Sequence, residues 1–166
     1  MFVNICKLSL KLFLGGLGKV GNGLSTIAVY NGIYKLLSND AVILQKLGLP
    51  PTPTNEQKGR KIQKRSKPQE LSDNLPIITY YTPGGNMDII NQNVYKPLFY
   101  FDIYTKDNVN LAHEIAERIF ELFDGVVNCF PNLENAEASF IDAHESDPGQ
   151  PNVYCFTLEI LFSIAV

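Results

Sequence analysis

The chain contains no tryptophan and only two methionines, two histidines and three cysteines among its 166 residues. The number of cysteines is odd, and the three of them, Cys6, Cys129 and Cys155, include no C-x-x-C pair. No histidine stands where it would complete a zinc site with them. We therefore expect free thiols in a reducing compartment. Cys155 falls in a predicted strand, where a small buried side chain is its simplest role.

Long uncharged apolar runs are lacking at the N-terminus. Phe2–Leu17 is rich in leucine, but Lys7 and Lys11 interrupt it, and its longest uncharged run is Leu12–Gly18. This run is too short for a signal peptide or for a membrane span of about twenty residues. We expect residues 1–23 to be an amphipathic arm and a glycine-rich connector that docks on the sheet or on a neighbouring subunit. Binding to a membrane surface is the less favoured alternative, so no membrane partner is predicted.

Nucleotide-binding motifs are incomplete. Gly16, Gly18 and Gly21 match G-x-G-x-x-G, but no strand with an acidic residue about twenty positions on completes a dinucleotide fold. A P-loop also fails, because Val20 follows Lys19 where serine or threonine is required. The sequence therefore predicts no cofactor.

The two histidines do not stand in a catalytic pattern. Asp142 and His144 would share one face of a strand and supply only two metal ligands, while Glu145 would point to the other face. A solvated turn is the simpler interpretation of residues 142–145. No serine or cysteine is spaced to place a nucleophile against His113. We therefore predict no metal site and no enzymatic activity.

Charge is distributed unevenly along the chain. Residues 1–67 contain 11 basic and 2 acidic residues, whereas residues 68–166 contain 3 basic and 15 acidic residues, within a net charge of −3. Opposite charges on the two parts can steer copies of one protein into a heterologous contact that closes into a ring. Two ordinary solvated faces would give the same pattern.

A basic stretch crowds six cations into ten positions: Lys58, Arg60, Lys61, Lys64, Arg65 and Lys67. Residues 54–75 show no periodicity, so we predict a long basic loop there, or a hairpin with a mobile tip. It could brace a neighbour's acidic surface, line a ring lumen through which DNA passes, or remain solvated, and the first is favoured because residues 68–166 carry the compensating charge. Six phosphate contacts would bind nucleic acid with strong salt dependence, but no aromatic residue stands there to stack on bases.

The remaining pattern predicts a single α+β domain over residues 24–166. With 45% hydrophobic residues, 8 tyrosines and 10 phenylalanines, the chain can form a core around a sheet. We expect a mostly antiparallel sheet of about four strands with helices packed on one face. The predicted helices and strands lie at Ser25–Asn39, with Ser25 as the helix cap, and at Ala41–Leu47, Pro76–Tyr81, Leu98–Thr105, Ala136–Asp142 and Val153–Val166. A further helix is predicted to be capped by Asp107 or Asn108 and to end at Gly125. Its predicted buried stripe consists of Leu111, Ala112, Ile115, Ala116, Ile119, Phe120 and Phe123.

The last predicted strand is unusually long. Apolar side chains occupy every second position of Val153–Val166, which predicts one buried face. Fourteen residues would reach roughly 46 Å, so we expect part of the strand to pair outside its own subunit. The candidate residues for this sheet-edge interface are Val153, Cys155, Thr157 and Glu159.

Four segments together resemble the tail-terminator, or tail-completion, proteins of long-tailed bacteriophages. They are IYKLLSND at Ile33–Asp40, FYFDIYT at Phe99–Thr105, AHEIAERIFELFDG at Ala112–Gly125, and the hairpin at Ala138–Phe162. The resemblance spans Ser25–Val166, and the N-terminal arm and the basic stretch lie outside its pattern.

The resemblance implies a structural protein of the virion neck, assembled in the host cytoplasm, that catalyses nothing. Such proteins form a ring, commonly of six copies, that caps the tail tube, ends its polymerisation and offers a surface to the head connector. The implied partners are further copies of the chain, the tail-tube protein and the connector or stopper protein, with DNA passing through the lumen. Two alternatives stay open: another neck component, such as a head-completion or stopper protein, and a nucleic-acid-binding protein that uses the basic stretch.

Overall fold

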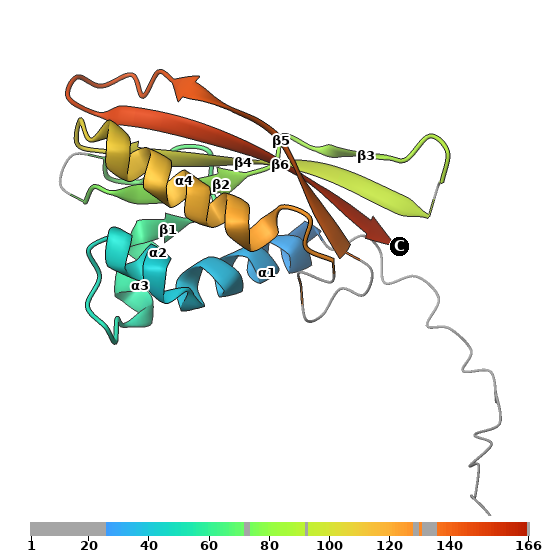
Figure 1. Cartoon of the computed structure of the whole chain (residues 1–166), viewed down its shortest axis with the longest axis horizontal. Coiled ribbons are helices and arrows are strands. Elements are labelled where there is room, and N and C mark those ends of the chain that lie inside the picture. The colour runs from blue at the N-terminus through green and yellow to red at the C-terminus, as the bar shows by residue number, and fades with distance from the viewer. Residues whose placement is uncertain (1–25, 72–73, 92, 128–129, 131–135, 166) are drawn as a thin grey trace, which may run out of the picture.

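A sheet of six strands carries four helices on one face in the part of the chain that the computed structural model describes (Figure 1). The described residues are 26–71, 74–91, 93–127, 130 and 136–165. The predicted arm at residues 1–23 and the predicted helix cap Ser25 lie outside these residues. The α+β class and the helices on one face are confirmed.

The helices are α1 (Thr26–Asn39), α2 (Ala41–Lys46), α3 (Asn55–Lys61) and α4 (Val109–Phe123). The strands are β1 (Ile62–Gln63), β2 (Ile77–Tyr81), β3 (Gly85–Met87), β4 (Val94–Thr105), β5 (Ala136–Ser146) and β6 (Tyr154–Ala165). Their order is β1-β2-β4-β6-β5, and β3 pairs with β4 beyond the end of β2. All pairs are antiparallel except β1 with β2. The sheet exceeds the expected four strands because β1 and β3 are too short to show an alternating pattern.

The core lies between the sheet and the helices. Phe162 of β6 is fully buried, with its ring centroid 5.5 Å from that of Phe99, 5.6 Å from that of Phe123 and 5.3 Å from that of Phe130. Edge-to-face and tilted contacts of this kind add to the energy of burial. Gly32 of α1 also meets this cluster, because a Cβ built there would lie 2.3 Å from the Phe130 ring. The aromatic cluster therefore fixes how closely α1 approaches the sheet.

Helix α4 follows its sequence pattern closely. The Asn108 side chain accepts a hydrogen bond from the Leu111 N–H at 3.0 Å, as expected of a helix cap. Five apolar residues of the predicted stripe are buried: Ala112, Ile115, Ala116, Ile119 and Phe123. Phe120 was expected in the same stripe but is exposed, and its ring packs against Phe140 instead. The helix is thereby held under β4, β5 and β6.

The Asp40 side chain links helices α2 and α4. Its side chain caps α2 by accepting a hydrogen bond from the Ile43 N–H at 2.8 Å, and Arg118 of α4 donates to it from Nε and from Nη2 at 2.7 Å. Burial opposes ionisation of Asp40, but the hydrogen bonds from Arg118 and Ile43 outweigh it, so the pKa of Asp40 is lowered. The ionised carboxylate is the form that the fold stabilises.

Replacing Asp40 by alanine should lower the free energy of unfolding by about 1–2 kcal/mol, the usual cost of losing a cap. Asp40→Asn keeps a capping oxygen and removes the charge, so it should cost less. Because the folded pKa lies below the unfolded value, the contribution is present at neutral pH and is lost as pH falls below about 4. Urea unfolding at pH 7 and pH 3 tests this. An equal loss from Asp40→Ala at both pH values would contradict the role of the charge.

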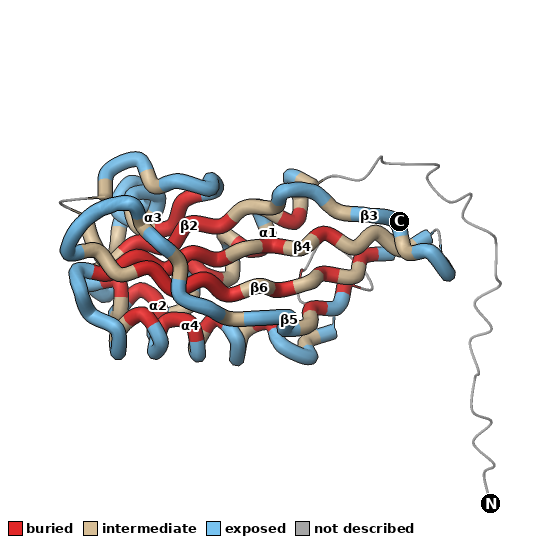
Figure 2. The backbone as a smooth tube through the Cα atoms, turned by 90° about the horizontal axis from the view of Figure 1, so that it is seen from above, coloured by how far each residue is buried: buried red, intermediate tan, exposed pale blue. Residues whose placement is uncertain are grey.

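The sheet face away from the helices is partly covered by β5. A β-bulge interrupts the pairing of β5 with β6 between Phe140 and Asp142, and beyond it β5 rises on the side of the sheet away from the helices (Figures 1 and 2). Bulges bend a strand and increase its twist. Ile77, Thr79 and Cys155 are buried on this face although no described helix covers it. We call this side the open face. Among the described residues, no helix has the length and apolar character needed to cross a membrane.

Candidate functional site

The basic stretch begins with a helix, so the prediction of a loop over residues 54–75 is wrong for its first part. Thr54 and Gln57 form a capping box: the Thr54 hydroxyl accepts from the Gln57 N–H at 3.2 Å, and the Gln57 side chain accepts from the Thr54 N–H at 2.8 Å. Helix α3 follows, and it buries none of its residues. An apolar stripe is therefore absent, and the capping box was the local signal that could have revealed the helix.

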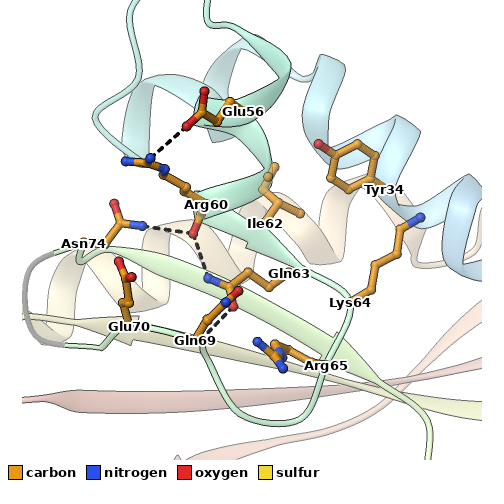
Figure 3. Close-up of a pocket in the computed structure, with 11 residues that line it drawn as sticks. Tyr34, Glu56, Arg60, Ile62, Gln63, Lys64, Arg65, Gln69, Glu70 and Asn74 are labelled. Carbon is orange, nitrogen blue, oxygen red and sulfur yellow. Dashed lines mark hydrogen bonds and ion pairs between the residues drawn. The ribbon is translucent and has the colours of Figure 1, made fainter.

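Strand β1 and a buried glutamine hold the next part of the stretch. Gln63 pairs in parallel with Thr79, its amide nitrogen donates to the Arg60 carbonyl at 2.8 Å, and its amide oxygen accepts from the Gln69 N–H at 2.9 Å (Figure 3). Asn74 donates to the same Arg60 carbonyl at 3.1 Å. The described part of the segment after β1 is therefore tied to the end of α3.

The six cations divide into two groups. Arg60 pairs with Glu56, Lys61 donates to the Asn74 carbonyl, and Lys64 donates to Asn31 and lies over the Tyr34 ring. Burial lowers the pKa of Lys61. The side chains of Lys58, Arg65 and Lys67 make no hydrogen bond or ion pair with other described residues. The second group is therefore available to a partner.

A pocket of about 620 Å³ opens beside the basic stretch (Figure 3). Its lining includes Arg60, Lys64 and Arg65, but also the carboxylates of Glu56 and Glu70. Carboxylates repel phosphate and weaken a purely anionic ligand. The mixed charge fits a surface that meets polar protein groups better than one that tracks a nucleic-acid backbone.

The open face holds a row of polar side chains across four strands: Thr79, Asp102, Thr157 and His144. Thr157 donates from its hydroxyl to Asp102 at 2.7 Å. Its single proton is then used, so Ser146, whose hydroxyl lies 2.6 Å from that of Thr157, must be the donor in their contact. Asp102 is 6% exposed and forms no ion pair with a lysine or arginine among the described residues.

Burial raises the pKa of Asp102, although Thr157 and Tyr104 donate hydrogen bonds that favour its ionised form. The folded state therefore holds a proton on Asp102 more tightly than the unfolded state. The ionised carboxylate reduces stability above the raised pKa, and the free energy of unfolding should increase as pH falls through it.

Asp102→Asn should consequently stabilise the protein at neutral pH, because the amide oxygen still accepts from Thr157 and the charge is gone. We expect an increase in Tm of a few degrees at pH 7 and a smaller difference from the wild type at pH 5. Calorimetry at both pH values tests this. Thr157→Val, which removes the donor and leaves the charge, should lower Tm and serves as the matched control.

The predicted sheet-edge interface at Val153, Cys155, Thr157 and Glu159 is wrong as an edge. Strand β6 lies between β4 and β5 and pairs with both along its described length, so its backbone is not free to add a strand. Cys155 and Thr157 are buried, and Val153 precedes the strand. Burial and the charge of Asp102 raise the pKa of the Cys155 thiol to about 12, so it stays protonated at neutral pH.

The sheet instead ends at β1 on one side and at β5 on the other, and the two sides carry opposite charges. Strand β1 and helix α3 present the basic stretch, while β5 and α4 lie along the opposite edge (Figure 2). We call these the basic edge and the acidic edge. The exposed carboxylates of the acidic edge are Glu114, Glu117, Glu121, Glu137, Asp142 and Glu145. Glu117 and Glu137 form no ion pair with other described residues.

Two solved structures share this fold. A chain from the virion of a native gene transfer agent particle superposes with a TM-score of 0.57 at 12% identity, covering 81% of this chain and 92% of that chain. A second solved protein superposes with a TM-score of 0.54 at 11% identity, covering 87% and 98%. At these identities the likeness shows the fold. No protein-family model and no curated protein matches the sequence.

Proposed function

We propose that this chain is a structural virion protein, and that it works as a tail terminator: a ring that caps the tail tube, ends its polymerisation and joins it to the head connector. The observation that carries the proposal is the shared fold with a chain of a gene transfer agent virion, over 92% of that chain. The tail-terminator resemblance of the sequence supports the same class. A ring of this kind acts through geometry and needs no catalytic group.

The two charged edges support a ring. A heterologous contact joins two different surfaces of one protein and closes if the rotation between copies is right. The basic edge and the acidic edge lie on opposite sides of the sheet, so the basic edge of one copy can meet the acidic edge of the next. The bulge in β5 and its charged side chains oppose simple strand addition there. Charge pairing is therefore the better account of the contact.

The hairpin of β3 and β4 supports contact with a further component. Ile89 and Ile90 at its tip are 98% and 97% exposed. Asp88 holds the turn by accepting from the N–H groups of Ile90 and Asn91 and by pairing with Lys96, and Lys96 together with these N–H groups lowers the pKa of Asp88 to about 2. A fixed turn that presents two isoleucines to water is typical of a docking element. We assign this tip to contact with the tail tube or the connector.

The test is the native mass of the full chain at low and moderate salt, with negative-stain images of the same sample, alone and with tail tubes of the particle that contains it. We expect a ring, or a monomer that forms a ring on tube ends, and tubes that stop growing when it is added. A monomer that leaves tube length unchanged would contradict the proposal.

The same samples separate the alternatives. Rings that bind portal complexes and ignore tubes would identify a head-completion or stopper protein. A monomer that ignores tubes but binds DNA, with affinity that falls steeply as salt rises, would identify a nucleic-acid-binding protein.

A further inference from the structure

Three potential metal ligands converge on the open face of the sheet, away from the basic stretch. His144 Nδ1 lies 3.5 Å from a carboxylate oxygen of Asp142 and 3.9 Å from one of Glu159. One ligand atom from each residue can be chosen so that all three lie within 4.8 Å of one another. The sequence pattern showed only Asp142 and His144, because Glu159 comes from the neighbouring strand.

The bulge in β5 creates this arrangement. Before it, Ala136 and Ala138 face the core, and an unbroken strand would place Asp142 and His144 on that same face. The extra residue reverses the alternation, so Asp142 lies opposite Glu159, and His144 lies opposite Thr157. The three side chains therefore stand together on two paired strands, which hold their backbones at fixed separations.

The charges around the cluster favour a bound cation. No lysine or arginine pairs with Asp142 or Glu159 among the described residues, and the His144 imidazole lies beside both. The side chain of Glu159 is 15% exposed and makes no hydrogen bond with other described residues, and the buried carboxyl group of Asp102 lies in the same row of polar side chains. The carboxylates of Asp142 and Glu159 therefore have no lysine or arginine partner in the described part of the chain.

We propose that Asp142, His144 and Glu159 form a binding site for a divalent transition-metal ion such as Zn²⁺ or Mn²⁺. Metal–ligand bonds of about 2.0–2.1 Å in a tetrahedral site space the ligand atoms about 3.4 Å apart, so small rotations of the exposed Asp142 and His144 side chains toward Glu159 complete the geometry. The imidazole selects transition metals over Ca²⁺ and Mg²⁺, which prefer oxygen ligands. The ion would hold the bent half of β5 on β6 and keep a coordination position open to water or to a further ligand. The site does not depend on the proposed tail function.

Calorimetric titration of the full chain, stripped of metal with a chelator, with ZnCl₂ and separately with MnCl₂ tests the site. We expect one ion per chain, an increase in Tm with the metal, and much weaker binding of Mg²⁺. His144→Gln and Glu159→Gln should each weaken binding at least about tenfold, the lower limit seen even for residues that only support a ligand. His113→Gln, which changes the other histidine on α4, is the matched control and should bind as the wild type does.

The visible spectrum of bound Co²⁺ distinguishes binding at this site from binding by the cysteines. Co²⁺ bound by nitrogen and oxygen gives visible d–d bands without the charge-transfer band of a thiolate. Asp142→Asn, at the most exposed ligand, repeats the test if Glu159→Gln fails to fold. No binding at millimolar metal, unchanged affinity in His144→Gln, or a thiolate band that persists in that variant would each overturn the proposal.

Discussion

Replacing Phe162 by alanine is expected to lower the free energy of unfolding by about 3–5 kcal/mol, a large part of the stability of a domain of this size. Phe162 is fully buried on the central strand β6, and its ring contacts those of Phe99, Phe123 and Phe130. Truncation removes its apolar surface and leaves a cavity between the sheet and α4. Collapse of the cavity is hindered because β6 is paired on both sides.

Urea unfolding followed by circular dichroism measures the effect. Phe120→Ala is the matched control, because the same side chain stands on α4 at 39% exposure and contacts Phe140 at the surface. It should cost about 1 kcal/mol, near the average for point mutations. An equal loss of unfolding free energy in the two variants would show that the aromatic cluster contributes no more to stability than a surface contact does.

The sequence predicted the elements whose periodicity runs over many residues. The alternation in β6 gave the correct buried face, with Phe156, Leu158 and Ile160 in the core. The cap of α4 was confirmed, and so was its stripe apart from the exposed Phe120 and the partly exposed Leu111. These patterns work because one face of each element is buried along its whole length. The fold class followed from them.

The shortest strands were missed because they form only by pairing with strands that are distant in the sequence. Strands β1 and β3 contain two and three residues and exist through hydrogen bonds to β2 and β4, which no local pattern records. Helix α3 buries no residue, so only the capping box at Thr54 and Gln57 marked it in the sequence. A loop was predicted there because an exposed helix shows no apolar periodicity in its sequence.

The error over β6 has a different cause. Alternation reveals which face of a strand is buried, but it does not reveal how many strands lie beside it. The long strand was interpreted as an edge that pairs outside its own subunit, whereas β4 is equally long, β5 is one residue shorter, and both pair with it. The candidate metal site was hidden for a related reason. Its ligand Glu159 comes from the paired strand, and the bulge that exposes Asp142 has no simple sequence signature.

Reversing two charges of the basic edge should abolish the ring proposed above and leave monomers. We choose Arg65→Glu with Lys67→Glu because both side chains are exposed and make no hydrogen bond or ion pair with other described residues, so the fold should be unaffected. Lys61 and Lys64 are less suitable, since each has a partner within its own chain. In the ring contact proposed above, the new carboxylates would face the acidic edge of the next copy, and like charges placed across an interface cost several kcal/mol. The native mass at low salt should fall to that of one chain.

The acidic edge supplies the complementary test. Glu117→Lys with Glu137→Lys should also give monomers alone. An equimolar mixture with the reversed basic edge should assemble into rings in which the two variants alternate, because the two native edges pair with each other and the two reversed edges also carry opposite charges. Both pairs of changes in one chain should restore rings, since every contact then joins opposite charges again. Lys106→Glu, an exposed charge on the turn between β4 and α4, should leave the mass unchanged. If Arg65→Glu with Lys67→Glu leaves the rings intact but weakens DNA binding, the basic edge faces nucleic acid and the charge-paired contact is wrong.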